Sequence, residues 1–323
     1  MKRSIIAAVF AAGVIASAAA PAQAEWPADR PIRVLVGFGA GGGTDIVTRI
    51  VAQPLSELLH QTVLVENKPG AGGSIASTEV ARAAKDGYTA TMISTGHTVS
   101  AVMLKSLQYD AIKDFAPVAM VANSGFVIVA RVDFPANDIK GLVALAKASP
   151  GKLNFASVGL GSTQHFAGEL LLQDTGIIVT HVPYRGTPAL VTALLAGQVD
   201  YGVELVHAVQ GQVQAGKLKL LAVGSPQRWP TIPSVPTVAE SGVPGYAVTG
   251  WYGWVYPAGT PKPIVDKTNA ALKDVLSRPA VREQLAKVGA VVHVTSPEEF
   301  GAQIANEVAK WKAVRDKAGL EPK

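Results

Sequence analysis

The chain contains no cysteine among its 323 residues. This absence excludes disulfide bonds, thiol catalysis, iron–sulfur clusters and zinc sites built from thiolates. The 29 basic residues are scattered and form no Lys/Arg block, whereas nucleic-acid binding needs a clustered basic face. We therefore expect no nucleic-acid partner. The small excess of positive charge favours anionic solutes instead.

Several motifs of enzymes are also missing. No glycine-rich turn ends in the Gly-Lys-Ser/Thr of a phosphate-binding P-loop, and Ser162 does not lie in the G-x-S-x-G of a hydrolase. The histidines show no H-E-x-x-H spacing. These absences leave no indicated catalytic residue and no indicated metal site.

A targeting segment opens the chain. Two basic residues are followed by an uncharged, apolar run over residues 4–20, and Ala22-Gln23-Ala24 has the small-x-small pattern of a cleavage site. This pattern predicts a secretory signal over residues 1–24 that is cleaved after Ala24. The alternative is a membrane anchor, but the run is short and alanine-rich for a spanning helix. No later stretch is long and apolar enough to span a bilayer, so we expect a soluble protein outside the cytoplasm.

Short apolar runs alternate with amphipathic stretches along the rest of the chain. This alternation predicts an α/β fold with largely parallel strands. Helices are expected over residues 44–59, 74–84, 139–148, 166–172, 188–196 and from 297 onward, and strands over 32–36, 62–65, 89–93, 118–121, 126–129, 153–156, 177–182, 199–203, 218–223 and 251–255.

Local signals mark the ends of some of these helices. Thr187 is expected to be an N-cap, with Pro188 at the first helical position and Gly197 just past the end. Residues 296–299 read Ser-Pro-Glu-Glu, which predicts a capping box at the start of the last helix. Pro54 lies inside the first helix, where it is expected to produce a kink.

The chain is expected to cross twice between two domains. Asn123-Ser124-Gly125 lies between two predicted strands in an almost continuous apolar stretch, and we interpret this region as the first crossing between the domains. Residues 251–255 would then carry the chain back. The predicted first domain comprises residues 25–124 and 247–323, and the predicted second domain comprises residues 125–246. Two α/β units joined in this way form a clamshell that closes on a ligand at the carboxyl ends of its strands.

Two glycine-rich turns, residues 37–45 and 67–74, each follow a predicted strand and open a predicted helix. Glycine lets the backbone approach a ligand closely, and a helix start offers unpaired N–H groups to an anion. The two turns therefore predict a pocket for a negatively charged small molecule. Asp45 has two interpretations at this stage: it holds the turn and stabilises the helix dipole, or it contacts the ligand directly.

The first turn also fits another class of protein. Gly37-x-Gly39-x-x-Gly42, with Glu66 at the end of the next strand, resembles the fingerprint of an NAD-type oxidoreductase. Export argues against this alternative, because the cofactor would have to be loaded before export, usually with a twin-arginine signal. The chain has a lysine followed by one arginine at that place.

Several segments together resemble the Bug-type (TctC-type) solute-binding receptors of tripartite tricarboxylate transporters. Each motif is weak alone, but the ordered set covers essentially the whole chain after residue 24. The matching segments are Ile32–Phe38 with Gly41–Asp45, Glu66–Gly73, Tyr109-Asp110 with Asp114–Val118, Gly161–His165, His181–Gly186, Val235–Glu240 and Pro257–Pro261.

The resemblance implies a two-domain periplasmic binding protein of the Venus-flytrap, type II-like architecture, without enzymatic activity and without a cofactor. Such a receptor captures a small carboxylate and presents it to cognate membrane permease subunits, and a monomer is expected. A ligand-sensing receptor for a two-component system is the alternative. Carried over by motif position, the ligand-binding residues are Phe38, Ala40, Gly41, Gly42, Thr44, Asp45, Gly73, Ser94, Thr95, His97, Ser162, Thr163, Gln164 and Arg185.

The chain departs from the family pattern at Glu204-Leu205, where many members have an Asp or Asn pair. Glu204 is therefore a further candidate for the site. If it faces the cleft, it would select against a second carboxylate on the ligand, or accept a hydrogen bond from an amine or hydroxyl. The alternative is a solvent-facing side chain.

Overall fold

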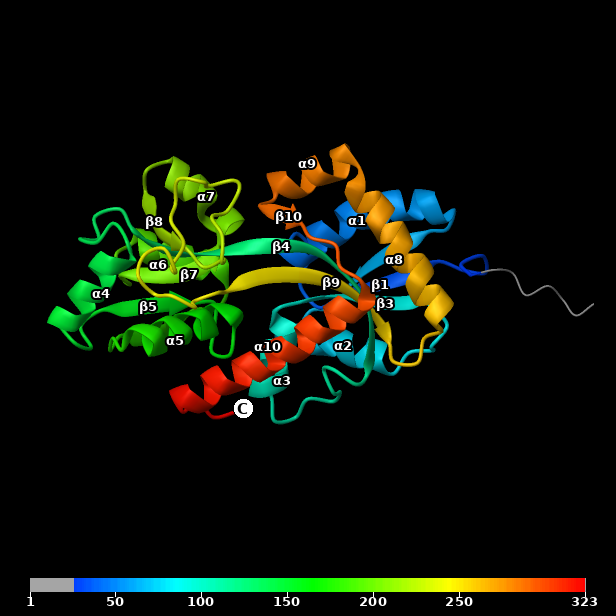
Figure 1. Ribbon diagram of the computed structural model, residues 1–323, viewed down its shortest axis with the longest axis horizontal. Coiled ribbons are helices and arrows are strands. Elements are labelled where there is room, and N and C mark those ends of the chain that lie inside the picture. The colour runs from blue at the N-terminus through cyan, green and yellow to red at the C-terminus, as the bar shows by residue number, and fades with distance from the viewer. Residues whose placement is uncertain (1–25, 323) are drawn as a thin grey trace, which may run out of the picture.

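Two long strands join the two halves of the molecule. The computed structural model describes residues 26–322, and Figure 1 shows β4 (Phe115–Arg131) and β9 (Thr249–Pro257) running side by side from one half into the other. They pair antiparallel, from Phe115 opposite Pro257 to Gly125 opposite Thr249. The α/β fold with two domains and two crossovers, predicted from the sequence, is confirmed.

The first half contains the parallel strands β1, β2 and β3, and β3 pairs antiparallel with β9. Apolar residues of α1, α8 and α9 cover one face of this part of the sheet, and those of α2 and α10 cover the other. The elements are β1 (Ile32–Val36), α1 (Gly43–Leu59), β2 (Val63–Asn67), the 3-10 turn η1 (Ala71–Gly73), α2 (Ser74–Ala81), β3 (Thr89–Ser94), α3 (Gly96–Met103), α8 (Lys262–Ser277), α9 (Pro279–Lys287), β10 (Ala290–Val292) and α10 (Pro297–Ala318).

The second half continues the same sheet, whose order is β2-β1-β3-β9-β4-β7-β5-β6, with β8 and β10 also pairing with β4. Residues of α4 and α5 lie in the core on one face, and residues of α6 and α7 in the core on the other. The elements are α4 (Ile139–Ala148), β5 (Asn154–Ser157), α5 (Thr163–Thr175), β6 (Thr180–Pro183), α6 (Thr187–Leu195), β7 (Tyr201–Leu205), α7 (Val206–Gln214) and β8 (Leu218–Val223).

The prediction of two separate strands on either side of Asn123-Ser124-Gly125 is wrong, because one continuous strand, β4, contains these residues. They continue the ladder with β9, where Ser124 is opposite Gly250. A Cβ at Gly125 would lie 2.8 Å from the ring of Trp229, so the glycine makes room for that ring.

Two predicted helix starts are shifted. α5 begins at Thr163 rather than Phe166, because the Ser162 hydroxyl accepts a hydrogen bond from the His165 N–H and caps the helix there. The N-cap of α6 is Gly186 rather than Thr187, whose hydroxyl donates to Glu204 instead. The capping box at Ser296 is confirmed.

The long helix α10 packs against both halves (Figure 1). Phe300 and Ile304 lie in a core of the first half, whereas Trp311 and Val314 lie in a core of the second. Its carboxyl-terminal part thus packs on the second half, although residues 247–323 are assigned to the first domain by the sequence. The exact domain boundaries stay a prediction.

The predicted signal over residues 1–24 lies outside the described residues. Within the part of the chain that the structure describes, none of the helices has the length and apolar character needed to cross a membrane.

The contact of Gly253 with α10 supports a first prediction. A Cβ at this position of β9 would overlap the ring of the fully buried Phe300. Gly253→Ala should therefore lower the free energy of unfolding by about 1–3 kcal/mol, measured by urea unfolding. The matched control is Gly301→Ala in α10, whose Cβ would meet Pro117 at an ordinary 3.5 Å. It should be neutral or stabilising, and equal destabilisation by both variants would contradict the prediction.

Candidate functional site

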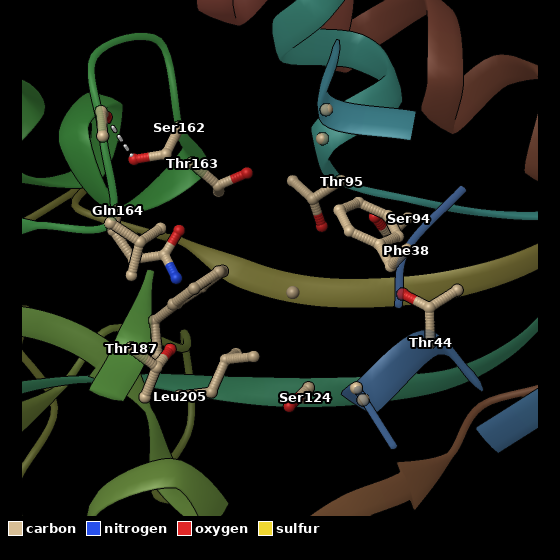
Figure 2. Close-up of a pocket in the computed structure, with 18 of the residues that line it drawn as sticks. Phe38, Thr44, Ser94, Thr95, Ser124, Ser162, Thr163, Gln164, Thr187 and Leu205 are labelled. Carbon is tan, nitrogen blue, oxygen red and sulfur yellow. Dashed lines mark hydrogen bonds between the residues drawn. The ribbon is translucent and has the colours of Figure 1, made fainter. Parts of the chain in front are cut away.

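A cavity of about 510 Å³ lies where the two halves meet. Figure 2 shows side chains of the first half on one side of it, side chains of the second half on the other, and the strands β4 and β9 between them. The first half contributes the hydroxyls of Thr44, Ser94, Thr95 and Ser100, the second half contributes Ser162, Thr163, Gln164 and Thr187, and the two strands contribute Ser124, Phe126, Gly250, Trp251 and Tyr252.

The lining of this cavity, as far as the described residues show it, contains no charged side chain. Three helices, α1, α3 and α6, begin in this lining, which we call the wall of the cavity. Their N-cap residues Gly42, Thr95 and Gly186 make no side-chain capping bond. Their first N–H groups therefore lack the partner that a cap usually supplies. The N-termini of α1 and α3 and the hydroxyls of Thr44, Ser94, Thr95 and Thr163 supply hydrogen-bond donors that suit an anion. The hydroxyl protons of Ser162 and Thr187 are instead donated to the Gly159 carbonyl and to Glu204.

The turns that open α1 and α5 have the same hydrogen-bond pattern on opposite sides of the cavity. The Gly42 N–H donates to the Gly39 carbonyl over 3.2 Å, and the Ser162 N–H donates to the Gly159 carbonyl over 3.2 Å. The glycines before the two caps have φ angles of 79° and 77°, which a residue with a Cβ rarely adopts. The second member of this pair is the Gly159–His165 turn, not the 67–74 turn on which the sequence had placed the emphasis.

In each turn, a side chain in the first turn of the helix fixes the loop. The Gly41 N–H donates to Asp45 Oδ2 over 2.8 Å, and the Gly161 N–H donates to His165 Nδ1 over 3.2 Å. Asp45 also accepts from Arg49 and Asn67. Although burial opposes it, these hydrogen bonds hold the pKa of Asp45 below its ordinary value. Of the two interpretations of Asp45, the structure favours the one in which it holds the turn.

The second glycine-rich turn supports the first one from behind. A Cβ at Gly37 would overlap the Gly73 backbone, and a Cβ at Gly73 would meet the Phe38 ring at 3.4 Å. Gly73 lies beside a separate space of about 10 Å³ rather than in the lining of the large cavity, which Gly72 reaches instead. The glycines allow two loop backbones to pack against each other.

His97 lies behind the wall as well. Its side chain is buried, its Nε2 lies 3.0 Å from the Ala111 carbonyl oxygen, and its ring stacks on Tyr109. Burial lowers the pKa of His97 to about 4. The imidazole is therefore neutral at neutral pH and belongs to the core of the first half.

Glu204 does not face solvent, because none of its surface is exposed. It lies directly beneath the wall and accepts hydrogen bonds from Thr187 Oγ1 over 2.6 Å, from the Leu205 N–H over 2.8 Å and from the Gln164 side chain. Burial raises the pKa of its carboxyl, and the three hydrogen bonds oppose that rise. All three partners line the cavity.

The structure brings eight of the predicted residues into the lining and places seven outside it. Ala40, Gly41 and Arg185 are exposed, and Asp45, Gly73, His97 and Glu204 lie behind the wall. The strand residues Ser124 and Trp251 were not predicted, because only the pairing of β4 with β9 puts them at the cavity. The eight are Phe38, Gly42, Thr44, Ser94, Thr95, Ser162, Thr163 and Gln164.

The sequence and the fold are similar to those of known proteins. The family profile described as "Tripartite tricarboxylate transporter family receptor" matches residues 47–320. The solved structure of the periplasmic binding protein BugD is 37% identical, with a TM-score of 0.78, and the match covers 92% of this chain and 100% of that one.

Two further solved structures contain a carboxylate. Rpa4515 from R. palustris, solved with adipate, is 32% identical with a TM-score of 0.82, and the match covers 93% of this chain and 100% of that one. MatC (Rpa3494) from Rhodopseudomonas palustris, with bound malate, is 34% identical with a TM-score of 0.76, and the match covers 88% of this chain and 98% of that one.

The packing of the two glycine-rich turns gives a prediction. Gly37→Ala should lower the free energy of unfolding by about 1–3 kcal/mol, because a Cβ would force the Gly73 backbone away. Gly39→Ala in the same loop is the control, since no atom lies within 4 Å of its Cβ position. Urea unfolding of both variants distinguishes them, and a harmless Gly37→Ala would show that the two turns do not depend on each other.

Acid should destabilise the protein through His97. The pKa of this histidine falls from 6.5 to about 4 on folding, so the unfolded chain binds a proton that the folded protein does not. The free energy of unfolding should decrease between about pH 6.5 and pH 4, by up to about 3 kcal/mol. Urea unfolding across this range should show the decrease, and His97→Gln should make it smaller. The remaining decrease comes from His181, whose pKa burial lowers to about 3, and from His207, whose pKa burial also lowers. An unchanged pH dependence in the variant would exclude His97 as its source.

Proposed function

Because the chain belongs to the tripartite tricarboxylate transporter receptor family, we propose that this solute-binding receptor works in the periplasm and captures a small carboxylate in the cavity between its two halves. It then presents the occupied form to the membrane permease subunits of its transporter. The observation that carries the proposal is the wall of neutral donors, which two matching turns supply from opposite halves.

The chemistry of this wall suits a carboxylate that must bind and leave. A buried arginine or lysine would be costly in the empty cleft, because a charge without its partner loses its hydration. Backbone N–H groups and hydroxyls satisfy the carboxylate oxygens directly or through ordered water, and they carry no net charge when the cleft is empty. Adipate and malate in Rpa4515 and MatC support a small carboxylate as the ligand class.

The two connecting strands support a closing motion. The strands β4 and β9 connect the halves, and α10 and α3 pack across them, with Val99, Val102 and Met103 of α3 in a core of the second half. A small bend of the two strands would bring the two turns toward each other. Thr44 on one side and Thr163 on the other would then approach the same carboxylate.

The surroundings of Glu66 argue against the oxidoreductase alternative. Glu66, which the fingerprint would place on a ribose hydroxyl, forms a bidentate ion pair with Arg33, with both N–O distances at 2.8 Å. The hydrogen bonds from Arg33 hold the pKa of Glu66 below its ordinary value. A carboxylate engaged in this way is not available to a nucleotide.

A thermal-shift screen tests the proposal. Purified protein is heated with a panel of carboxylates that includes adipate and malate, and with neutral and cationic solutes of similar size. At least one carboxylate should raise the melting temperature in a concentration-dependent way. Stabilisation by neutral or cationic solutes alone would overturn the proposal. Mass spectrometry of ligand retained by protein purified without denaturation would identify the compound.

Removal of one wall hydroxyl should weaken binding without unfolding the protein. Thr163→Ala should reduce the affinity for the best carboxylate by about tenfold or more, because a hydrogen bond to a charged group is lost. The stability of the empty protein should change by less than about 1 kcal/mol. Thr192→Ala is the control, since that hydroxyl bonds to the Pro188 carbonyl on the exposed face of α6. Calorimetric titration measures both, and an unchanged affinity would remove Thr163 from the site.

A further inference from the structure

The carboxylate of Glu204 has no cation to balance it. Within residues 26–322 the structure shows no ion pair to Glu204, although its side chain is fully buried. Asp45, the carboxylate behind the lining of the first half, is paired with Arg49 at 2.9 Å. The two carboxylates therefore differ in their partners: Asp45 has a cation beside it, whereas Glu204 is held by hydrogen bonds alone.

Hydrogen bonds to Glu204 also determine which hydrogen-bonding groups of the second half remain free for a ligand in the cavity. Thr187 has one hydroxyl proton, and it points to Glu204. The side chain of Gln164 also bonds to Glu204, and Figure 2 shows its amide nitrogen directed toward Thr187 and its oxygen directed away. The amide oxygen and the hydroxyl lone pairs are left for the cavity, and both of these are acceptors.

Glu204 lies at the start of two helices. α6 begins at Thr187, which bonds to its Oε1, and α7 follows Leu205, whose N–H bonds to its Oε2. A carboxylate at a helix N-terminus neutralises the partial positive charge there. In the second half, this internal carboxylate already occupies the electrostatic position that an anionic ligand group would take.

We propose that Glu204 sets the ligand class of this receptor: a monocarboxylate whose far end carries a hydroxyl or ammonium donor, with a second carboxylate disfavoured. The inference rests on the proposed function, because it assumes that one carboxylate is held by the donor wall. The donor at the far end meets the Gln164 oxygen and the Thr187 hydroxyl. A second carboxylate at that place has no proton to donate and would meet these two acceptors without a hydrogen bond.

Matched ligand series test this inference on the unmodified protein. One series is adipate, 6-hydroxyhexanoate, 6-aminohexanoate and hexanoate, and the other is succinate, 4-hydroxybutanoate, 4-aminobutanoate and butanoate. Calorimetric titration should give, in at least one series, a hydroxy or amino acid that binds about tenfold or more tighter than the diacid. Comparison of these two acids shows which donor is preferred.

The outcomes separate the two proposals. If the diacid binds as tightly as the other acids or more tightly in both series, the inference about Glu204 is wrong while the carboxylate receptor stands. If no acid of either series or of the wider carboxylate panel binds, the proposed function itself is wrong. A preference for the unsubstituted acid would show that the acceptors at Gln164 and Thr187 do not meet the ligand.

Replacement of the carboxylate by an amide provides the second test. Glu204→Gln keeps the size of the side chain, and its amide N–H can donate to Thr187, whose hydroxyl proton is then free for the ligand. The ratio of diacid to hydroxy-acid affinity should therefore shift toward the diacid by about tenfold or more. Glu240→Gln makes the same replacement at an exposed position of the second half and should leave that ratio unchanged. Circular dichroism confirms that both variants fold. An unchanged ratio in folded Glu204→Gln would overturn the inference, and the ligand series on the unmodified protein decides it if that variant does not fold.

Discussion

The antiparallel ladder between β4 and β9 holds the two halves together and forms the floor of the cavity between them. Ser124 and Gly250, opposite each other near one end of the ladder, lie in the lining, so the same backbone hydrogen bonds that connect the halves also bring them to a common site. A Cβ at Gly250 would lie 3.1 Å from the Ser124 carbonyl oxygen, so the floor leaves little room for a side chain at this position. The positions of the loops on both sides depend on this ladder.

Local sequence signals predicted what depends on local structure. The Gly37–Asp45 turn and the Ser162-Thr163 pair both lie at the starts of helices, where glycine, serine and threonine have clear conformational preferences. The structure places part of the turn, Phe38 and Gly42–Thr44, and both residues of the pair in the lining of the cavity. Gly73 and His97 could not be placed in this way. Their positions depend on which loop packs against Gly37 and which ring packs against Tyr109, and such contacts between distant segments leave no periodic signal.

Contacts between distant segments also explain why the sequence predicts two separate strands around Asn123-Ser124-Gly125 where the structure has one. Polar residues and glycine between two apolar runs usually indicate a turn, but a strand tolerates them where both neighbours of the sheet supply hydrogen-bond partners. Here β9 and β10 both pair with Ser124. The register of three strands from distant parts of the chain decided the outcome, and one stretch of sequence does not contain that register.

The part of the wall that we propose to hold the anion consists mainly of backbone groups, held in place by glycines and by the side chains of Asp45 and His165 behind them. A backbone N–H is present whatever side chain its residue carries, proline apart. Side-chain changes elsewhere in the cleft can therefore alter the fit to the rest of the ligand while the anion-binding wall is kept. Receptors of this architecture could therefore bind different acids with the same backbone groups around the carboxylate and different side chains around the rest of the ligand.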